Sequence, residues 1–334
     1  MIKKFISIRL RHIIMYIISF LLLFFILQKG NSDVLLSNVN VMTSKSTLKS
    51  YLSNYDIQCI LSDVDGTLLS SDHTIGTRTY TAIQNAIKCG YKVFPCTGRS
   101  RKSMQLATGD KFMSLFGNHD IGIPGVYQQG LMVYNEKNEI IYERLLDNDV
   151  IIKVEQFCEE FDIGLIAYCG ERIIAKKTSP KTNFIEKYKE PIPDEYPLGL
   201  GELQKNGIKV HKLILLDNDD ILIKIRPELE KKIGSIASTT KAVPGMLEVL
   251  PLNASKGFGV QKLLEYYNVD KKNTIAFGDG ENDIEMLKLV EIGAAVENAK
   301  AMLKSIANIV IDSNDKEGVA TVIEVLTEIR NKES

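Results

Sequence analysis

The strongest chemical signal in the sequence is a pair of carboxylates, Asp63 and Asp65, in the motif Asp-Val-Asp-Gly-Thr. The motif ends a short apolar run, 57–64, that predicts a buried strand. Two carboxylates at i and i+2 of a strand point to the same face, and Gly66 permits a sharp turn behind them. Such a pair repels itself unless a cation or proton is shared. Because Mg²⁺ prefers hard oxygen ligands, the motif predicts a magnesium site.

Two alternatives exist for this motif. A calcium-binding loop that starts at Asp63 would need glycine at its sixth position and glutamate at its twelfth. Those positions hold Leu68 and Thr74, so a calcium loop is excluded. The other alternative, a plain surface turn without a ligand, is not excluded by the five residues taken alone.

A second acid-rich motif, Gly-Asp-Gly-Glu-Asn-Asp, occupies residues 278–283. It follows a predicted strand, 274–277, and opens a predicted helix. Ligands of doubly wound sheets bind beyond the carboxyl ends of the strands. We therefore expect Asp279 and Asp283 to supply carboxylates to the same cation, although a helix cap alone would also explain Asp283.

Two shorter elements complete a predicted phosphate site. Thr97, Gly98 and Arg99 follow a predicted strand, 91–96, and Thr97 offers a hydroxyl and backbone amides to a phosphate oxygen. Lys256 begins a predicted helix and offers a positive point charge. Each element alone is weak evidence for phosphate binding, since Thr-Gly-Arg is a common turn and most helical lysines are solvated. Their order and positions indicate phosphate binding.

The elements that position these motifs alternate along the chain. Apolar runs and helical spacings predict strands at 57–64, 91–96, 274–277, 293–296 and 309–311, and helices at 77–89, 100–106, 255–267, 283–290 and the C-terminus. This alternation predicts an α/β fold, a doubly wound, mostly parallel, Rossmann-like sheet. Two short strands around a turn at 128–130 are expected within 121–134.

The middle of the chain has a different order of expected strands and helices, which predicts a small α+β domain inserted into the sheet domain. Its expected elements are a helix at 150–161, strands at 165–169, 172–176 and 212–216, and a helix at 229–236. The acidic run at 217–220 is interpreted as a solvated turn, with a metal site as the alternative.

These patterns divide the chain into five segments. They are a signal peptide or membrane anchor at 1–31, a linker at 32–55, the first part of the core at 56–144, the inserted domain at 145–243 and the second part of the core at 244–334. In the first segment, basic residues precede an uncharged apolar run, 13–27, which is typical of a signal peptide and short for a span of ~20 residues. We expect a protein that is secretory or membrane-anchored through this segment, and otherwise cytoplasmic, and we leave cleavage open. A buried core helix is the alternative for the apolar run.

The composition excludes several functions. The net charge of −1 provides no broad positive field for nucleic acid. There are five cysteines and four histidines, with no C-x-x-C spacing, which gives a zinc site little to build on. The cysteines are interpreted as free thiols, and a disulfide framework is the alternative.

Taken in order, the four motifs resemble those of the haloacid dehalogenase superfamily. The long insert between the second and third motifs resembles the α/β cap of the Cof-type subfamily, as do 255–257, 278–286, 307–310 and 317–319. The resemblance runs from about residue 56 to the end of the chain. One departure is Gln128-Gln129-Gly130, which stands where many Cof-type proteins have Asn-Gly-Ala.

The resemblance implies a Mg²⁺-dependent phosphatase. Asp63 would be the nucleophile that forms an aspartyl phosphate, and Asp65 the general acid and then the base. The implied Mg²⁺ ligands are Asp63, the backbone carbonyl of Asp65, Asp279 and, through water, Asp283. The implied phosphate- and substrate-binding residues are Thr97, Gly98, Arg99, Lys256 and Asn282.

The substrate implied by the resemblance is a small phosphorylated metabolite, and by analogy a sugar phosphate. The cap would close over it and set specificity. Two alternatives stay open: a phosphomutase acting on a hexose phosphate, and a catalytically silent binding protein on the same fold. The sequence does not define the oligomeric state.

Overall fold

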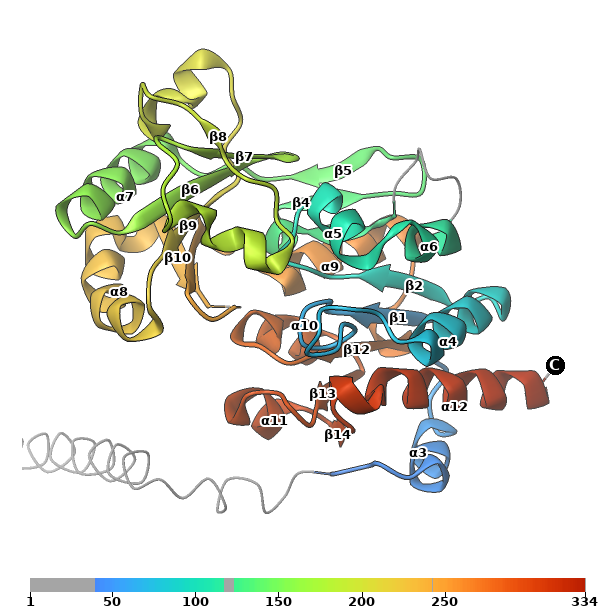
Figure 1. Cartoon of the computed structure of the whole chain (residues 1–334). Coiled ribbons are helices and arrows are strands. Elements are labelled where there is room, and N and C mark those ends of the chain that lie inside the picture. Colours follow the sequence, from blue (N-terminus) through green and yellow to red (C-terminus); the bar gives the residue numbers. More distant parts are fainter. Residues whose placement is uncertain (1–39, 117–122, 242, 334) are drawn as a thin grey trace, which may run out of the picture. The chain divides into compact units, whose positions relative to one another are not determined.

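The structure is a computed structural model that describes residues 40–116, 123–241 and 243–333 (Figure 1). The predicted signal or anchor segment, 1–31, and its apolar run, 13–27, lie outside the described residues. Within the part that is described, no helix is both long and apolar enough to cross a membrane.

The core is a five-stranded parallel sheet in the order β14-β13-β12-β1-β2. Its strands are β1 (Cys59–Ser62), β2 (Lys92–Pro95), β12 (Thr274–Gly278), β13 (Ile292–Val296) and β14 (Ile309–Ile311). Nearly every residue in them is buried, as expected when both faces of a parallel sheet are covered. The chain leaves β1 toward β2 and later returns to β12 on the other side of β1, so the strand order reverses between β1 and β12. The predicted doubly wound α/β fold is confirmed.

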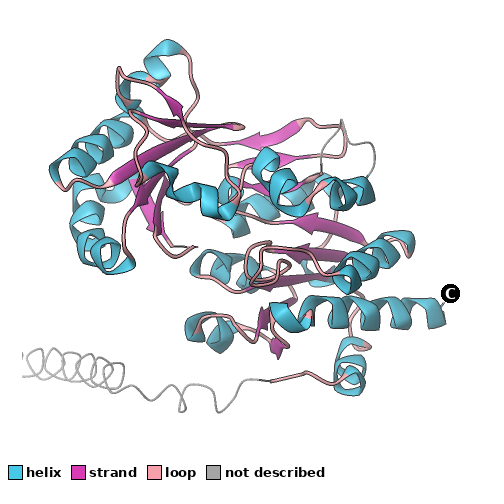
Figure 2. Cartoon of the chain, in the orientation of Figure 1, coloured by secondary structure: helices cyan, strands magenta, loops and turns pink. Residues whose placement is uncertain are grey.

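The helices of the core lie alongside its strands (Figure 2), and helices that pack in this way bury one apolar stripe. In α4 the buried positions Thr79, Ala82, Ile83 and Ala86 are three and four residues apart, and this helix packs against α12. Helix α9 packs against α10. The core helices are α4 (Thr77–Lys88), α5 (Arg101–Thr108), α6 (Asp110–Met113), α9 (Lys256–Tyr267), α10 (Ile284–Leu289), α11 (Ala301–Ile306) and α12 (Gly318–Glu333).

A small antiparallel sheet of β3 (Gly125–Tyr127), β4 (Met132–Tyr134) and β5 (Ile140–Glu143) adjoins the core through a parallel bridge between Cys96 and Val126. The two strands expected around 128–130 are present. Gln128 and Gln129 in that turn both have positive φ, 49° and 62°, which is unusual for residues with a side chain. The Gln128 side chain donates to the backbone oxygen of Gly170 in the insert at 2.6 Å.

The inserted domain is built on a six-stranded sheet in the order β10-β11-β9-β6-β7-β8, covered by two helices (Figure 1). Its elements are α7 (Asn148–Glu160), β6 (Gly164–Cys169), β7 (Arg172–Ala175), β8 (Asp194–Glu195), β9 (Lys212–Leu216), α8 (Asp219–Ile233), β10 (Ala237–Thr240) and β11 (Met246–Pro251). Strand β11 pairs with β9 and β10, so the sheet of the insert continues past residue 243, where the sequence placed its end.

Helix α8 begins at Asp219, well before the expected start at 229, which corrects that prediction. Asp219 and Asp220 occupy its first turn, where negative charge interacts favourably with the helix dipole. Pro227 lies inside the helix and obscured the pattern, because proline usually ends a helix. The acidic run makes protein contacts: Asp219 accepts from the N–H of Gly245 at 2.6 Å.

The prediction of a linker over 32–55 is wrong for part of its length, because α3 spans Lys45–Leu52. The Ser44 hydroxyl caps this helix by accepting from the N–H of Thr47 at 3.2 Å. Leu48 and Leu52, four residues apart, are buried, and the helix packs against α12. Two leucines are too few to establish a period in a polar segment, which is why the sequence did not reveal the helix.

We expect Leu52→Ala to lower the free energy of unfolding by about 2–4 kcal/mol, because a fully buried leucine leaves a cavity when it is truncated. Urea denaturation would measure this change. The matched control is Ser50→Ala on the exposed face of the same helix, which should change stability by less than about 0.5 kcal/mol. Equal stability of the two variants would show that α3 does not contribute to the folded core.

Candidate active site

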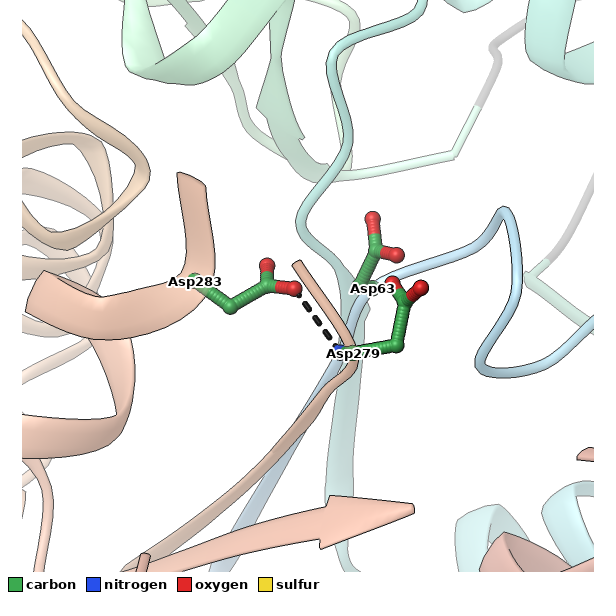
Figure 3. A group of neighbouring side chains, drawn as sticks. All are labelled: Asp63, Asp279 and Asp283. Atoms are coloured by element: carbon green, nitrogen blue, oxygen red, sulfur yellow. Dashed lines mark hydrogen bonds between the residues drawn. The ribbon is translucent and has the colours of Figure 1, made fainter. Parts of the chain in front are cut away.

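The two acid-rich motifs lie side by side because β1 and β12 are neighbouring strands. Ser62 is in register with Phe277, and the N–H of Asp63 donates to the Phe277 carbonyl at 3.0 Å. Asp63 and Asp279 therefore both stand beyond the carboxyl ends of strands, at the point where the strand order reverses. Carboxylate oxygens of Asp63, Asp279 and Asp283 all lie within 4.8 Å of one another (Figure 3).

Lys256 is the cation of this cluster. Its side chain is completely buried, and Nζ donates to Asp63 Oδ1 at 2.5 Å and to Asp283 Oδ1 at 2.7 Å. Burial lowers the pKa of Lys256, but Asp283 and Asp63 outweigh this effect and the net pKa is raised. The ammonium group therefore stays charged and fixes the orientation of the Asp63 carboxylate.

Asp283 uses both of its carboxylate oxygens inside the protein. Oδ1 binds Lys256, and Oδ2 accepts from the backbone N–H groups of Asp279 at 3.0 Å and Gly280 at 2.9 Å (Figure 3). It thus holds the loop and the lysine in place. Asp63 and Asp279 are left as the carboxylates best able to bind a cation directly.

Gly66 is required by the close approach of the two motifs. Its φ is +75°, and a Cβ atom added there would lie 2.7 Å from Oδ2 of Asp279. A side chain at this position would strain the backbone and push Asp279 away from Asp63. The glycine of the first motif therefore makes room for the carboxylate of the second.

The acidic cluster has the donor set of a divalent-cation site. Burial raises the pKa of Asp63 well above its ordinary value, Lys256 opposes this, and Asp283 and Asp279 add to it. Burial and then Asp283 raise the pKa of Asp279 to about 7. Crowded carboxylates of this kind are stabilised by protons or by a cation, and hard carboxylate oxygens suit Mg²⁺. The residues present therefore fit the ion that the sequence predicts.

We expect Mg²⁺ to stabilise the protein more at about pH 8 than at about pH 5.5, because ligands must be deprotonated to bind metal. The unfolded Asp279 carboxyl loses its proton near its ordinary pKa of 3.8, whereas the folded one keeps it until about 7. The metal-free folded state therefore binds more protons in this window, and its stability falls as pH rises through it. Bound Mg²⁺ should offset that loss.

Thermal melting with Mg²⁺ or with a chelator, at both pH values, measures this effect. Asp279→Asn is the control, since it removes the titrating ligand and should abolish the Mg²⁺-dependent shift. A shift of the same size at both pH values would contradict the assignment of Asp279 as a ligand that titrates near neutrality.

Asp65 points to Arg99 in the structure. The Arg99 Nε and Nη2 atoms donate to the two Asp65 oxygens at 2.7 and 2.8 Å, a bidentate pair. Burial lowers the pKa of Arg99, but Asp65 more than compensates and the net pKa is raised. Thr97 is buried, and its hydroxyl accepts from the N–H of Arg99 at 3.1 Å.

A second polar network was not anticipated from the sequence. Lys212 Nζ donates to the Gly98 carbonyl at 2.8 Å and to Glu248 at 2.9 Å. Gln129 donates to the other oxygen of Glu248 at 2.9 Å and accepts from Asn282 at 3.0 Å. Lys212 and Glu248 are lone charged residues in the apolar strands β9 and β11, which is the signal that could have indicated them. The network connects the second and fourth motifs to the insert.

These groups surround a cavity of about 40 Å³ between the core and the insert. Asp63, Asp65 and Asp279 line it from the core, and Tyr168 and Glu190 are among the residues that line it from the insert. A reacting group in this cavity would contact the acidic cluster on one side and the insert on the other.

Comparison with known proteins identifies the family. Residues 60–323 match the family model of the haloacid dehalogenase-like hydrolases. A chloroplastic endoribonuclease YBEY from Arabidopsis thaliana is 34% identical over 273 residues, which are 79% of this chain and 45% of that protein. The 5-amino-6-(5-phospho-D-ribitylamino)uracil phosphatase YwtE from Bacillus subtilis is 27% identical over 289 residues, 81% of this chain and 98% of that one.

Among solved structures, a HAD/COF-like hydrolase from Plasmodium vivax superposes with a TM-score of 0.77 at 26% identity, covering 84% of this chain and 99% of that one. The chain belongs to the haloacid dehalogenase-like hydrolase family, and the Cof-type resemblance is confirmed. It is an enzyme of the phosphatase class, a phosphoric monoester hydrolase. The chain spans less than half of the Arabidopsis protein, so the endoribonuclease name is not carried over.

Proposed function

We propose that the chain is a Mg²⁺-dependent phosphatase that hydrolyses a small phosphomonoester through an aspartyl phosphate on Asp63. The observation that carries this proposal is the Asp63 carboxylate, oriented by a buried Lys256 and lying within ligand distance of Asp279. A carboxylate held in this way suits nucleophilic attack on phosphorus.

The ion would be held by Asp63, Asp279 and the backbone carbonyl of Asp65, with Asp283 acting through water because its oxygens are already engaged. Mg²⁺ bound there would balance the negative charge of the phosphoryl group. Phosphoryl transfer depends mostly on positioning and charge stabilisation. Lys256 supplies a fixed positive charge to the same region.

Asp65 would protonate the leaving oxygen and then activate water. As described, both of its oxygens accept hydrogen bonds from Arg99, so its carboxylate is held in an accepting role. We infer that Arg99 moves its hydrogen bonds to the arriving phosphate. Asp65 is then released to carry the proton of the acid step.

The substrate proposed is a sugar phosphate or a related hydroxylated monophosphate. The name of the Bacillus subtilis relative describes a phosphorylated ribityl chain, which supports a polyol-like substrate for this chain. A phosphomutase is the second candidate, because a second acid such as Asp65 serves both reactions.

Phosphate release from p-nitrophenyl phosphate and from a panel of sugar phosphates tests the proposal. We expect turnover with Mg²⁺ and none after chelation. Isomerisation of a hexose phosphate with little free phosphate would replace the phosphatase by the mutase. Complete inactivity across the panel with Mg²⁺ present would favour a silent binding protein.

For localisation, we propose that the apolar run 13–27 directs the chain into the secretory pathway or anchors it in a membrane. The support is the basic-then-apolar order of the sequence. N-terminal sequencing of the mature protein and fractionation of cells would test this. An intact N-terminus on a protein found wholly in the soluble cytoplasmic fraction would contradict it.

A further inference from the structure

Glu190 of the insert lines the cavity with a buried carboxylate, and one of its two oxygens lacks a hydrogen bond of normal length. The side chain is only 6% exposed, and Oε1 accepts from Arg99 Nη1 at 3.3 Å. Oε2 is buried and has no hydrogen-bond partner among the residues that the structure describes, although the side chain lines the cavity. A buried polar atom without a partner costs about 1–3 kcal/mol, so this oxygen is suited to accept a hydrogen bond from a bound molecule.

The other charged groups that the insert presents to the cavity are already satisfied. Lys212 binds the Gly98 carbonyl and Glu248 and lies 4.5 Å from the centre of the Tyr168 ring. Glu248 accepts from Lys212 and from Gln129 through different oxygens. Within the described part of the cavity lining, Glu190 is the charged insert residue with a carboxylate oxygen that has no hydrogen-bond partner.

Tyr168 defines the surroundings of that oxygen. Its hydroxyl is buried, and burial and then the negative charges of Glu190 and Glu248 raise its pKa. The phenol therefore stays protonated, and its hydroxyl interacts with the Glu190 carboxylate. Ile214 and Met246 add apolar lining at this end of the cavity, and the cation there, Lys212, is already paired with Glu248.

Resting on the phosphatase function proposed above, we propose that Glu190 Oε2 accepts a hydrogen bond from a hydroxyl group on the leaving-group side of the substrate. The phosphorus must lie against Asp63 at the core side of the cavity, so the leaving group extends toward the insert and Glu190. The enzyme thereby selects hydroxylated monophosphates. It also discriminates against a leaving group that carries a second phosphate, since like charges repel in a buried site.

The bond between Glu190 and Arg99, at 3.3 Å, is the longest that Arg99 makes and the easiest to give up. Glu190 can then bind the leaving group while Arg99 binds phosphate.

The test compares kcat/KM for glucose 6-phosphate and p-nitrophenyl phosphate in Glu190→Gln. The amide oxygen of glutamine can keep the bond to Arg99, while its NH₂ group takes the place of Oε2 and donates where the carboxylate accepted. We expect a loss of about 10- to 100-fold for glucose 6-phosphate and less than about 3-fold for p-nitrophenyl phosphate, whose leaving group has no donor. The matched control is Glu186→Gln, an exposed residue of the same segment, which should leave both values unchanged.

An equal loss on both substrates would show that Glu190 acts only by positioning Arg99, and would overturn the proposal. No loss on either substrate would overturn it as well. As a further arm, glucose 1,6-bisphosphate should be a poor substrate of the wild type and a relatively better one of Glu190→Gln; an unchanged ratio would count against the charge discrimination. Wild-type turnover of p-nitrophenyl phosphate without turnover of glucose 6-phosphate would overturn this inference and leave the phosphatase function standing. Absence of both activities would overturn the two together.

Discussion

Asp63→Asn should abolish phosphate release, with kcat falling by at least about 10,000-fold, as expected when a covalent nucleophile is removed. The amide has the same shape, and its oxygen can still accept from Lys256, which binds Asp63 at 2.5 Å. It lacks the negative charge and the nucleophilicity needed to attack phosphorus. The loss should therefore be chemical and not structural.

Steady-state turnover of p-nitrophenyl phosphate measures the loss, and mass spectrometry of acid-quenched enzyme should find phosphate on the peptide that contains Asp63 in the wild type alone. Asp72→Asn is the matched control, since Asp72 is an exposed aspartate in the same part of the chain. Residual activity of Asp63→Asn above about 1% of wild type would place the nucleophile elsewhere.

Lys256→Met should cost both stability and activity. The lysine side chain is fully buried between Asp63 and Asp283, which are 7% and 0% exposed. Removing one partner of a buried ion pair leaves uncompensated charge and costs about 3–5 kcal/mol. Activity should fall as well, because in the proposed mechanism Lys256 orients the nucleophile and balances phosphate charge.

Urea denaturation of the metal-free protein measures the first effect. The control is Lys262→Met on the same helix, which removes a surface ion pair with Glu265. The side chains of Lys262 and Glu265 are 33% and 50% exposed, so this variant should change the free energy of unfolding by less than about 1 kcal/mol. A double variant, Lys256→Met with Asp283→Asn, should recover part of the stability and none of the activity. Wild-type stability of Lys256→Met would be incompatible with a buried, charged lysine at this position.

The core and the acidic centre were predictable from sequence because their signals are local. Buried parallel strands are short apolar runs bounded by turns, and both Asp63 and Asp279 come directly after such runs. A doubly wound sheet brings the carboxyl ends of its strands to one edge, so the convergence of the two motifs followed from the order of the elements.

The insert and its contacts were less predictable because they depend on tertiary pairing. Strand β10, Ala-Ser-Thr-Thr, has no apolar alternation and forms a strand only as the edge partner of β11. The partners Gln129 and Glu248 are 119 residues apart in the chain, and no local pattern brings them together. The unpaired oxygen of Glu190 is visible only once the insert is placed over the core.

The turn at Gln128 and Gln129 links the position of the insert to the conformational energy of the backbone. Left-handed backbone at residues other than glycine costs about 1–3 kcal/mol each, and both side chains bind the insert, at Gly170 and at Glu248. An outward movement of the insert would break both bonds and leave the turn free to relax.

The N–H groups of the same turn donate to the carbonyls of Arg99 and Thr97, at 3.0 Å from Gln128 and 3.1 Å from Gln129. Relaxation of the turn would therefore reach the loop at Thr97 and Arg99, which the proposed function assigns to phosphate binding. We therefore expect binding in the outer half of the cavity and affinity for the phosphoryl group to be reciprocally linked. A leaving group that held the insert in place would raise the affinity for phosphate, and bound phosphate would favour the same position of the insert to the same degree.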